Sequence, residues 1–289
     1  MKHKVIKIAK KDFPDKLKQI KSVPSNLYAI GDINLLYNES FGIVGTRKIS
    51  NYGIGNCEEF TKEFAIRDIP TVSGLALGTD TVVHKTTLEY GGKTIAILGS
   101  GFDNVYPIEN LELFNSIIKS GGLVLTEFEN SVKPIKENFP KRNRIITAIS
   151  EGILVIEAAY RSGTSITAKH AKQQGKKVFA VPGLLNSSVG KGVNRLIKEG
   201  AILTTEINDI FEYYPQFLSK TKREIKTSVN NIKEEYADIY RLLYNKSGAT
   251  FDEILNYINI PVRELILKLT NMELDNIIKA EITGKYILL

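Results

Sequence analysis

The chain has 289 residues, of which 43% are hydrophobic and 25% are charged, and its formal net charge is +7. This composition is ordinary for a globular protein, and the single cysteine, Cys57, excludes an internal disulfide and a cysteine-rich zinc site. No apolar run has transmembrane length and no signal-peptide pattern is present, so we expect a cytoplasmic protein without membrane insertion. The basic balance favours an anionic partner.

Residues 1–40 indicate a short lead-in to the main fold. Residues 1–11 alternate lysine with valine and isoleucine, which predicts an edge strand or a frayed tail. A small helical segment with prolines at its turns follows. We expect this lead-in to be too short to form a domain.

Apolar runs alternate with helical patterns from residue 41 to residue 215. The runs include FGIVG, KTIAILGSG, GLVLTE and KKVFAVPG, and helices of about ten to fifteen residues are expected between them. This alternation predicts parallel strands joined by right-handed crossovers, and hence an extended Rossmann-like, doubly wound α/β core. Such sheets bind ligands where strand carboxyl ends face helix amino termini, and most of the unusual polar residues fall there.

The last part of the chain has a different pattern. Residues 216–232 lose the apolar period and predict a linker. Residues 233–289 predict three short helices and a hairpin, the order of a winged-helix domain, and Thr250 and Glu253 fit a capping box at the second helix. Because this domain has seven basic and nine acidic residues, we expect it to contact protein or to bind DNA weakly.

Two glycine-containing loops follow the first two strands of the core. Gly45-Thr46-Arg47, with Ser50 further on, offers a close backbone approach, free helix N–H groups and an arginine suited to phosphate. The second loop runs from Ser73 to Asp80, and His84 lies one turn later. A catalytic Asp/His pair would also use this spacing, but no nucleophile motif lies nearby, so we expect structural roles for both.

The stretch FPKRNRIITAISEGILVIEAAYRSG, residues 139–163, combines an aromatic residue with a dense set of bases. Residues 133–177 contain ten basic and three acidic residues, whereas residues 41–215 as a whole contain 20 and 18. A stacking face and positive charge are what an unpaired strand needs. Helix capping and surface charge explain each residue singly, but not their concentration at strand ends. The residues predicted to contact nucleic acid are Arg47, Ser50, Ser73, Gly74, Phe139, Lys141, Arg142, Asn143, Arg144, Arg161, Ser162, Gly163, Thr164 and Lys169.

Several segments together resemble the DprA/Smf family, the DNA-processing proteins of bacterial natural transformation. They are GTRKISNYG, SGLALGTD, GSGFDNVYP, FPKRNRIITAIS, VIEAAYRSGTSITA, VFAVPG and GVNRLIKEGA, in family order. The resemblance implies an extended Rossmann fold that binds single-stranded DNA in a basic pocket, protects incoming DNA, loads a RecA-type recombinase and forms a homodimer. A single-strand-binding protein is a further expected partner. We expect no catalytic residue, metal or cofactor.

The resemblance also assigns roles by position. It implies that the strand is held by Arg47, Ser50, Phe139, Lys141 and Arg144, and that the dimer contact lies near Asn194, Leu196 and Ile197. Two departures stand out. The longer N-terminal helical domain of many members is missing, and Leu77 stands where the family usually has a basic residue, which removes one expected phosphate contact.

Two other functions use the same core. Related Rossmann proteins hydrolyse nucleotide N-glycosidic bonds with a glutamate beside a glycine-rich loop, and Glu157 and Glu127 are the nearest equivalents here. A nucleotide-sensing module is the other alternative, by fold analogy alone. The strand-binding hypothesis requires that Arg47, Lys141 and Arg144 lie along one rim of the sheet.

Overall fold

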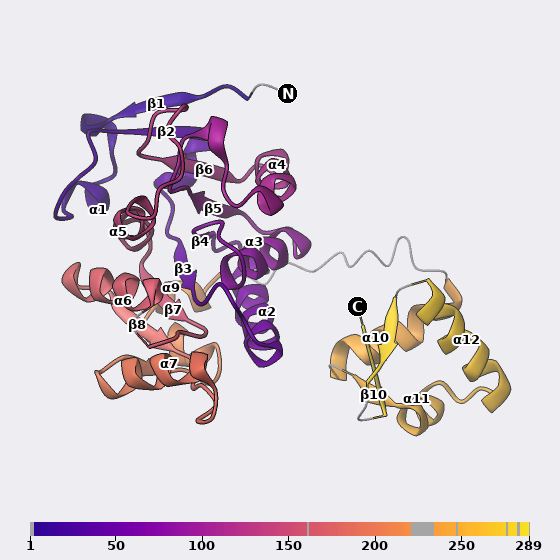
Figure 1. The fold of residues 1–289 in the computed structure, drawn as a ribbon. Helices are drawn as coiled ribbons and strands as arrows, with labels where there is room; N and C mark the ends of the chain where they lie inside the picture. Colours follow the sequence, from indigo (N-terminus) through magenta and orange to yellow (C-terminus); the bar gives the residue numbers. More distant parts are fainter. Residues whose placement is uncertain are drawn as a thin grey trace. The chain divides into compact units, whose positions relative to one another are not determined.

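The computed structural model describes residues 3–160, 162–220, 234–246, 248–275, 277–281 and 284–288. The chain divides into two units, Met1–Glu224 and Ile225–Leu289. The strands of the first unit (Figure 1) are β1 (Ile6–Ala9), β2 (Asn26–Gly31), β3 (Phe41–Val44), β4 (Thr71–Ser73), β5 (Thr94–Ile97), β6 (Leu123–Thr126), β7 (Gly152–Val155), β8 (Lys177–Ala180) and β9 (Ile202–Leu203). Its helices are α1 (Asp15–Lys18), α2 (Asn51–Ala65), α3 (Thr79–Glu89), α4 (Leu111–Lys119), α5 (Asn138–Ile149), α6 (Gly163–Gln173), α7 (Ser188–Lys198), α8 (Asn208–Phe211) and α9 (Pro215–Leu218). Short 3-10 turns are η1 (Lys10–Asp12), η2 (Ile33–Leu36), η3 (Phe102–Asn104) and η4 (Ile108–Asn110).

In the described part of the first unit, the strands form one sheet in the order β1-β2-β6-β5-β4-β3-β7-β8-β9. Along the part of the sheet that runs β6-β5-β4-β3-β7-β8-β9, each strand is parallel to its neighbours. In contrast, β2 is antiparallel to both β1 and β6. The chain moves outward from β3 to β6 and then returns to the other side of β3 with β7 (Figure 1). The predicted doubly wound, mainly parallel α/β fold is therefore confirmed, with its switch point between β3 and β7.

Residues 26–31 differ from the helical lead-in expected on sequence grounds. They form β2, which pairs with β6 and carries β1 on its other edge. Leu27 and Ala29 are buried in one hydrophobic cluster and Ile30 in another, which shows the two-residue period of a strand with two covered faces. The first segment therefore extends the sheet of the core, and α1 is a short helix on it.

Both faces of the central strands are covered, which explains their continuous apolar sequences. One face packs against buried residues of α1, α5, α6 and α7, among them Leu17, Ile149 and Val193. The other face packs against α2, α3 and α4 and against the aromatic residues of α8 and α9. Cys57 is fully buried there, as expected for a small apolar residue.

The second unit contains α10 (Ala237–Lys246), α11 (Phe251–Ile258), α12 (Val262–Leu274), β10 (Ala249–Thr250), β11 (Ile278–Ala280) and β12 (Lys285–Leu288), with the 3-10 turn η6 (Glu234–Tyr236) before them. Its strands form an antiparallel sheet in the order β10-β12-β11. The predicted capping box of Thr250 and Glu253 at α11 is confirmed. Of the predicted linker, residues 216–218 belong to α9, where Phe217 is buried, and residues 221–232 lie outside the described residues.

None of the described helices of either unit combines the length and the apolar character that a bilayer crossing requires.

Candidate nucleic-acid interface

A cleft of about 800 Å³ lies at the switch point of the sheet. Its walls come from the loops that follow β3, β4, β5, β6 and β7 and from residues of α5 and α6. The lining residues are Val44, Gly45, Thr46, Arg47, Ala76, Asp80, Tyr106, Pro134, Lys136, Phe139, Pro140, Arg142, Asn143, Ile146, Ser162, Gly163, Thr164, Ile166 and Thr167. Carboxyl-end loops of parallel strands are where doubly wound proteins bind ligands.

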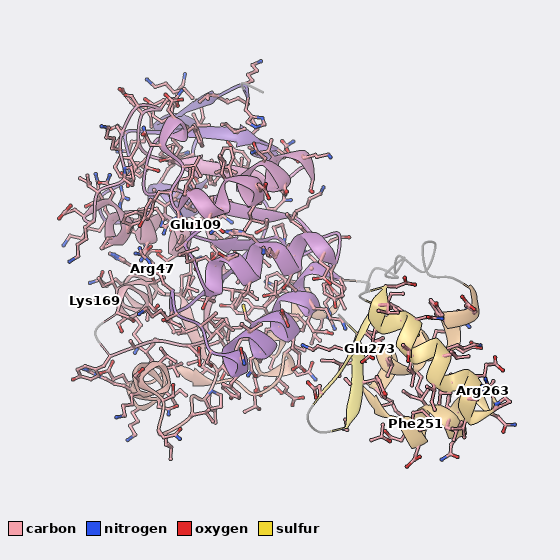
Figure 2. All side chains as sticks on the ribbon, turned by 45° about the vertical axis from the view of Figure 1, so that its right-hand side comes forward. Arg47, Glu109, Lys169, Phe251, Arg263 and Glu273 are labelled. Atoms are coloured by element: carbon pink, nitrogen blue, oxygen red, sulfur yellow. The ribbon has the colours of Figure 1, made fainter. Side chains whose placement is uncertain are left out.

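Arg47 and Phe139 form a cation–aromatic pair in this cleft. The guanidinium carbon of Arg47 lies over the Phe139 ring, 5.1 Å from its centroid, and the Tyr106 ring lies 5.7 Å from the same ring. Arg47 is exposed (Figure 2), and Phe139 is half-buried. The pair offers a flat apolar surface beside a positive charge that solvent can reach.

Arg142 lies deeper in the cleft and is committed to the fold. Its guanidinium donates to the carbonyl oxygen of Gly74 at 2.6 Å and to that of Ile97, which ties α5 to the carboxyl ends of β4 and β5. Burial lowers the pKa of Arg142 to about 10, against the opposing charge of Asp80. Burial likewise raises the pKa of Asp80, and the positive charge of Arg142 opposes that rise. Arg142 therefore lines the cleft as a cation and also holds α5 against the carboxyl ends of β4 and β5.

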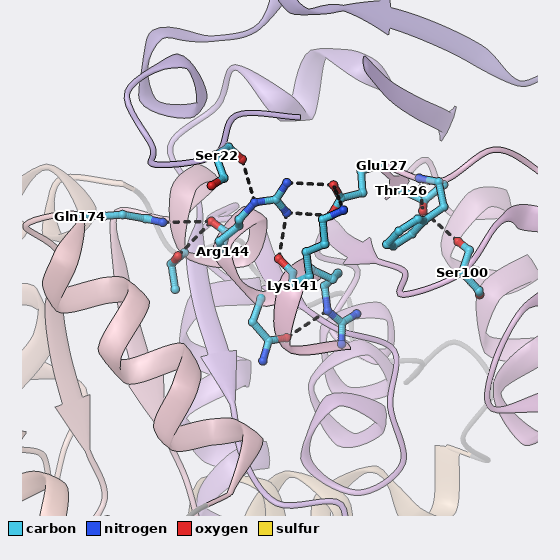
Figure 3. Close-up of polar contacts among 11 residues, drawn as sticks. Ser22, Ser100, Thr126, Glu127, Lys141, Arg144 and Gln174 are labelled. Carbon is cyan, nitrogen blue, oxygen red and sulfur yellow. Dashed lines mark hydrogen bonds and ion pairs between the residues drawn. The ribbon is translucent and has the colours of Figure 1, made fainter. Parts of the chain in front are cut away.

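The basic residues of α5 do not share one side of the helix. Phe139, Arg142 and Asn143 line the cleft, whereas Lys141 and Arg144 contact Glu127 (Figure 3). Arg144 donates to both carboxylate oxygens of Glu127, at 2.7 and 2.8 Å, and to the carbonyl oxygen of Ser22 at 2.9 Å. The Arg144 side chain is 7% exposed and that of Lys141 is 56% exposed.

The rim that we expected from Arg47, Lys141 and Arg144 together does not form. At 3.6 residues per turn, positions 141 and 144 fall on the side of α5 opposite to position 139. Four of the five N–H groups of Arg144 already donate, to the Glu127 carboxylate, to the Ser22 carbonyl oxygen and to the Lys141 carbonyl oxygen. Within the cleft itself, the positive charges of described residues come from Arg47, Lys136 and Arg142.

The amino terminus of α2 is also occupied. The hydroxyl oxygen of Ser50 accepts from the Gly53 N–H at 3.1 Å, while its own N–H and O–H donate to the Glu157 carboxylate at 2.9 and 2.6 Å. The Gly53 N–H, one of the free N–H groups expected at this helix, is therefore used inside the protein, and the Glu157 carboxylate lies at the helix terminus. Ser73 is buried and donates to the Ile43 carbonyl oxygen, and Gly74 is buried against Arg142.

The amino terminus of α6 faces the cleft. Thr164 donates to the Gly45 carbonyl oxygen at 2.9 Å, and the Asn143 amide nitrogen lies 3.4 Å from the Gly163 carbonyl oxygen. Gly163 is exposed, and the Ser162 hydroxyl is buried without a protein partner. Lys169 is exposed on α6 but does not line this cleft, and Arg161 lies outside the described residues.

Several lining residues were not among those predicted to contact nucleic acid. Lys136 is exposed and belongs to the basic run before α5, and Tyr106 follows the glycine turn after β5. The charge run was a usable signal for Lys136. No local pattern marks Tyr106, because its neighbour Phe139 comes from a distant segment.

The residues predicted at a dimer contact have partners within the chain. The Asn194 side-chain amide makes two hydrogen bonds with Gly183. It accepts from the Gly183 N–H at 2.9 Å and donates to the Gly183 carbonyl oxygen at 2.8 Å. Leu196 belongs to the core of the first unit, and Ile197 packs against that core. Their role between two copies of the chain stays a prediction.

The two carboxylates considered for glycosidic hydrolysis lie outside the cleft wall. Glu157 accepts from Ser50, and Glu127 is paired with Arg144 and Lys141. Asp80 is the acidic residue among the described lining residues, and Arg142 lies beside it. Within the described ranges, no group of three or more histidine, cysteine, aspartate or glutamate side chains could hold a metal ion.

The fold defines a doubly wound α/β protein, and its cleft at the switch point is a candidate binding site lined by basic and aromatic residues. Residues 4–215 match the family described as DNA recombination-mediator protein A, and the chain belongs to this family. Proteins of the family are DNA-binding mediators rather than enzymes.

Named relatives agree with this placement. The chain is 41% identical to DNA processing protein DprA of Bacillus subtilis over 212 residues, which are 73% of this chain and 71% of that protein. It is 39% identical to protein Smf of Escherichia coli over 210 residues, 73% of this chain but 56% of Smf. The match thus spans little more than half of Smf.

Two solved structures have the same fold in their matched parts. The X-ray structure of DprA from Streptococcus pneumoniae superposes with a TM-score of 0.69 at 37% identity, over 72% of this chain and 74% of that one. DNA processing protein A from Helicobacter pylori, whose structure was described for its single-stranded DNA binding mode, gives a TM-score of 0.67 at 29% identity, over 74% and 97%.

Proposed function

We propose that this chain holds single-stranded DNA in the cleft between β3 and β7, protects it, and passes it to a RecA-type recombinase during DNA uptake. Family membership supports the DNA-processing role, and the Helicobacter relative supports the single strand as ligand. The rim of Arg47, Lys141 and Arg144 that the sequence-based hypothesis required does not form, because Lys141 and Arg144 contact Glu127, so the proposal does not rest on that rim. The observation that carries the proposal is the pair of Arg47 and Phe139 at the switch point. A base that stacks on an aromatic ring contributes about 1–3 kcal/mol, and a nearby arginine neutralises a phosphate.

The charges of the cleft suit a polyanion. Three lining cations, Arg47, Lys136 and Arg142, face one lining acid, Asp80, among the described residues. Arg47 and Lys136 are exposed, so phosphates can reach them, and the first N–H groups of α6 add partial positive charge. The ligand would be held mainly through its backbone and by stacking, which gives little sequence preference and a strong salt dependence.

The geometry does not support the hydrolase alternative through the two carboxylates considered for it, and the carboxylate that does line the cleft, Asp80, lies beside Arg142. Glycosidic hydrolysis needs a carboxylate beside the bound sugar. Glu157 caps α2 through Ser50, and Glu127 neutralises Arg144. Neither side chain lines the cleft. Binding without chemistry is therefore the function that the site supports best.

The proposal also covers the second unit and a homodimer. In the second unit, the order of α10, β10, α11, α12, β11 and β12 supports a winged-helix domain. Since acidic residues outnumber basic ones there, we assign it a protein contact rather than the main DNA site. A homodimer with Asn194, Leu196 and Ile197 near its contact is part of the proposal, as is a partnership with a single-strand-binding protein.

Fluorescence anisotropy with labelled oligothymidylate tests the strand site. Arg47→Glu should weaken binding by about tenfold or more and lower the salt slope of the association constant by about 0.7, because one phosphate contact is lost. Phe139→Ala should weaken binding by about tenfold without changing the slope, because stacking carries no charge.

The matched control is Lys119→Glu. Lys119 is an exposed cation at the end of α4, near the amino end of β6 and thus at the end of the sheet opposite to the cleft. This substitution should leave the affinity within about twofold, since exposed charges beyond a Debye length of about 10 Å are screened. Full affinity in both the Arg47 and the Phe139 variant would refute the proposed site. Equal affinity for duplex and single strand would refute the proposed ligand.

A further inference from the structure

A cavity of about 510 Å³ lies where α4 packs on the sheet beside β2 and β6 (Figure 1). We refer to this cavity as the α4 pocket. Its walls come from the first half of α4, from η3, from the residues before β1 and from the loop after β6. None of its described lining residues also lines the cleft. The α4 pocket is therefore a separate candidate site, and its volume is in the range of known ligand pockets.

The floor of the α4 pocket is aromatic and apolar. The ring centroids of Phe102 and Phe114 lie 6.4 Å apart with their planes tilted by 52°, and the His3 ring meets Phe114 edge-on at 6.0 Å. Phe114 belongs to the hydrophobic core, whereas Phe102 is half-buried and Leu111 is 39% exposed. The faces of aromatic rings attract cations, and more strongly so where water is excluded.

Two hydrogen-bond acceptors adjoin this floor. The Asp103 N–H donates to the Asn130 carbonyl oxygen at 3.1 Å, which holds the two residues side by side. Asp103 is exposed, and its carboxylate makes no ion pair with another described residue. The side-chain oxygen of Asn130 is buried without a hydrogen-bond partner in the described chain. Unpaired acceptors at the wall of a cavity favour a ligand that brings N–H donors.

The other amide of the α4 pocket is already satisfied. Asn115 donates through Nδ2 to the Leu111 carbonyl oxygen at 3.0 Å, and its Oδ1 lies 3.0 Å from Nε2 of His3. The donors of a ligand would therefore go to Asp103 and Asn130.

The charge of the α4 pocket contrasts with the net charge of +7 of the whole chain. The described lining residues include Asp103 but no lysine or arginine. Among their described chain neighbours, Glu112 and Glu129 are exposed acids and Lys4 is the exposed base. A phosphate would meet like charge here, and a neutral apolar ligand would bury two acceptors without donors. A cation with N–H donors and an apolar stem satisfies the acceptors, the charge and the rings together.

We propose that the α4 pocket docks an arginine side chain from a segment of a partner protein in which apolar residues flank the arginine. The planar guanidinium offers parallel N–H donors, which suits two acceptors held side by side better than an ammonium does. The stem of the arginine packs on Phe102, and an apolar neighbour packs on the exposed part of Leu111. This inference does not require a strand in the cleft, because the two sites have different walls.

Nitrogen–proton correlation spectra of the full chain, titrated with the capped pentapeptide Ala-Leu-Arg-Leu-Ala, test the α4 pocket. The peptide should bind with a Kd of about 1 mM or below and should shift the amide signals of Phe102, Asp103 and Asn130. Citrulline in place of the arginine, which keeps the shape without the charge, should weaken binding by about tenfold. Glutamate in that place should abolish the shifts, because it repeats the charge of the pocket.

Asp103→Asn should weaken the arginine peptide by about tenfold and leave the affinity for oligothymidylate within about twofold. Glu59→Gln is the matched control, since Glu59 is an exposed acid on α2 that does not line the α4 pocket, and it should change neither affinity. The same spectra show whether each variant is folded.

Three results would overturn the proposal. The first is equal binding of the arginine and citrulline peptides, or unchanged binding of the arginine peptide to Asp103→Asn. The second is binding of capped single arginine as tight as that of the pentapeptide, which would make the ligand a small cation and not a protein segment. The third is a loss of oligothymidylate affinity in Asp103→Asn, which would assign the α4 pocket to the DNA site.

Discussion

Arg142 and Arg144 are buried arginines two positions apart on α5, and they hold different parts of the fold. Arg142 ties the helix to the ends of β4 and β5 and lines the cleft. Arg144 pairs with Glu127 and with the chain near Ser22. Two positions along a helix differ by about 200°, so the two side chains leave opposite sides of α5 and meet different partners, backbone carbonyls for Arg142 and the Glu127 carboxylate for Arg144.

The Glu127 cluster gives a matched test at the residue scale. Arg144→Met should lower the free energy of unfolding by about 3 kcal/mol or more, because it leaves the Glu127 carboxylate buried with one distant partner. Lys141→Met removes the exposed partner of the same carboxylate and should cost less than about 1 kcal/mol. Urea denaturation of both variants measures the difference. Equal losses of unfolding free energy in the two variants would show that the burial of Arg144 does not set its contribution to stability.

His84 gives a pH-dependent test. Burial, with a smaller effect of the Arg142 charge, lowers the pKa of His84 to about 3 from an ordinary value of 6.5. Between these values the unfolded chain binds a proton that the folded chain does not. The free energy of unfolding should therefore fall as the pH drops through this window, by up to about 1.4 kcal/mol per pH unit.

The comparison variant for this test is His84→Asn, which can keep the hydrogen bond that the ring nitrogen Nδ1 makes with Thr94. Denaturant unfolding of both proteins between about pH 4 and pH 6.5 should show a shallower pH dependence for the variant, because one group that titrates on unfolding is gone. Superimposable pH profiles of the two proteins would contradict the assignment.

At the scale of elements, the amino termini of α2 and α6 behave differently although both follow central strands. Glu157, which follows β7, fills the end of α2 through Ser50. The end of α6 is left facing the cleft, with Gly163 exposed. Phosphate binding by a helix terminus is therefore expected at α6 and not at α2.

The cap of α2 can be tested by stability and binding together. Ser50→Ala removes the acceptor for the Gly53 N–H and a donor to Glu157, and should cost about 1–2 kcal/mol of stability. It should leave the affinity for a short oligonucleotide within about twofold, because Ser50 does not line the cleft. Ser50→Thr, which keeps a hydroxyl cap, is the conservative control. A loss of affinity without a loss of stability would show that Ser50 contacts the strand.

At the scale of the whole molecule, the cleft is built entirely from the first unit. The second unit has its own hydrophobic core, which includes Leu243, Leu265 and Met272. Each unit buries its own apolar residues, so the cleft does not depend on the second unit for its geometry.

Removal of residues 225–289 tests this independence. The shortened chain should bind a short oligothymidylate within about twofold of the full chain, because every described lining residue is retained. Its free energy of unfolding, measured alongside, is the control for loss of fold. A loss of affinity by tenfold or more in a folded shortened chain would assign part of the strand site to the second unit.

Local patterns in the sequence were sufficient for the architecture of the core. Apolar runs separated by helical periods predict buried parallel strands, because burial on both faces demands continuous apolar sequence. The same reasoning placed Arg47, Phe139 and the α6 loop at the carboxyl edge, where they line one cleft. It missed β2, because a strand at the margin of a sheet depends on its partner β6 as much as on its own residues.

The sequence by itself determined the doubly wound core and the edge of the sheet where its polar loops gather, because strand and helix periods are local properties. Only the tertiary structure decided which of those polar residues remain accessible to a ligand. Charge neutralisation depends on contacts in space: Glu127, which follows the preceding strand β6, pairs with Arg144, and Glu157, more than a hundred positions from Ser50, accepts from it at the end of α2. Arg47, with Phe139 beneath it, is left exposed in the cleft, where the lining carboxylate, Asp80, is buried beside Arg142.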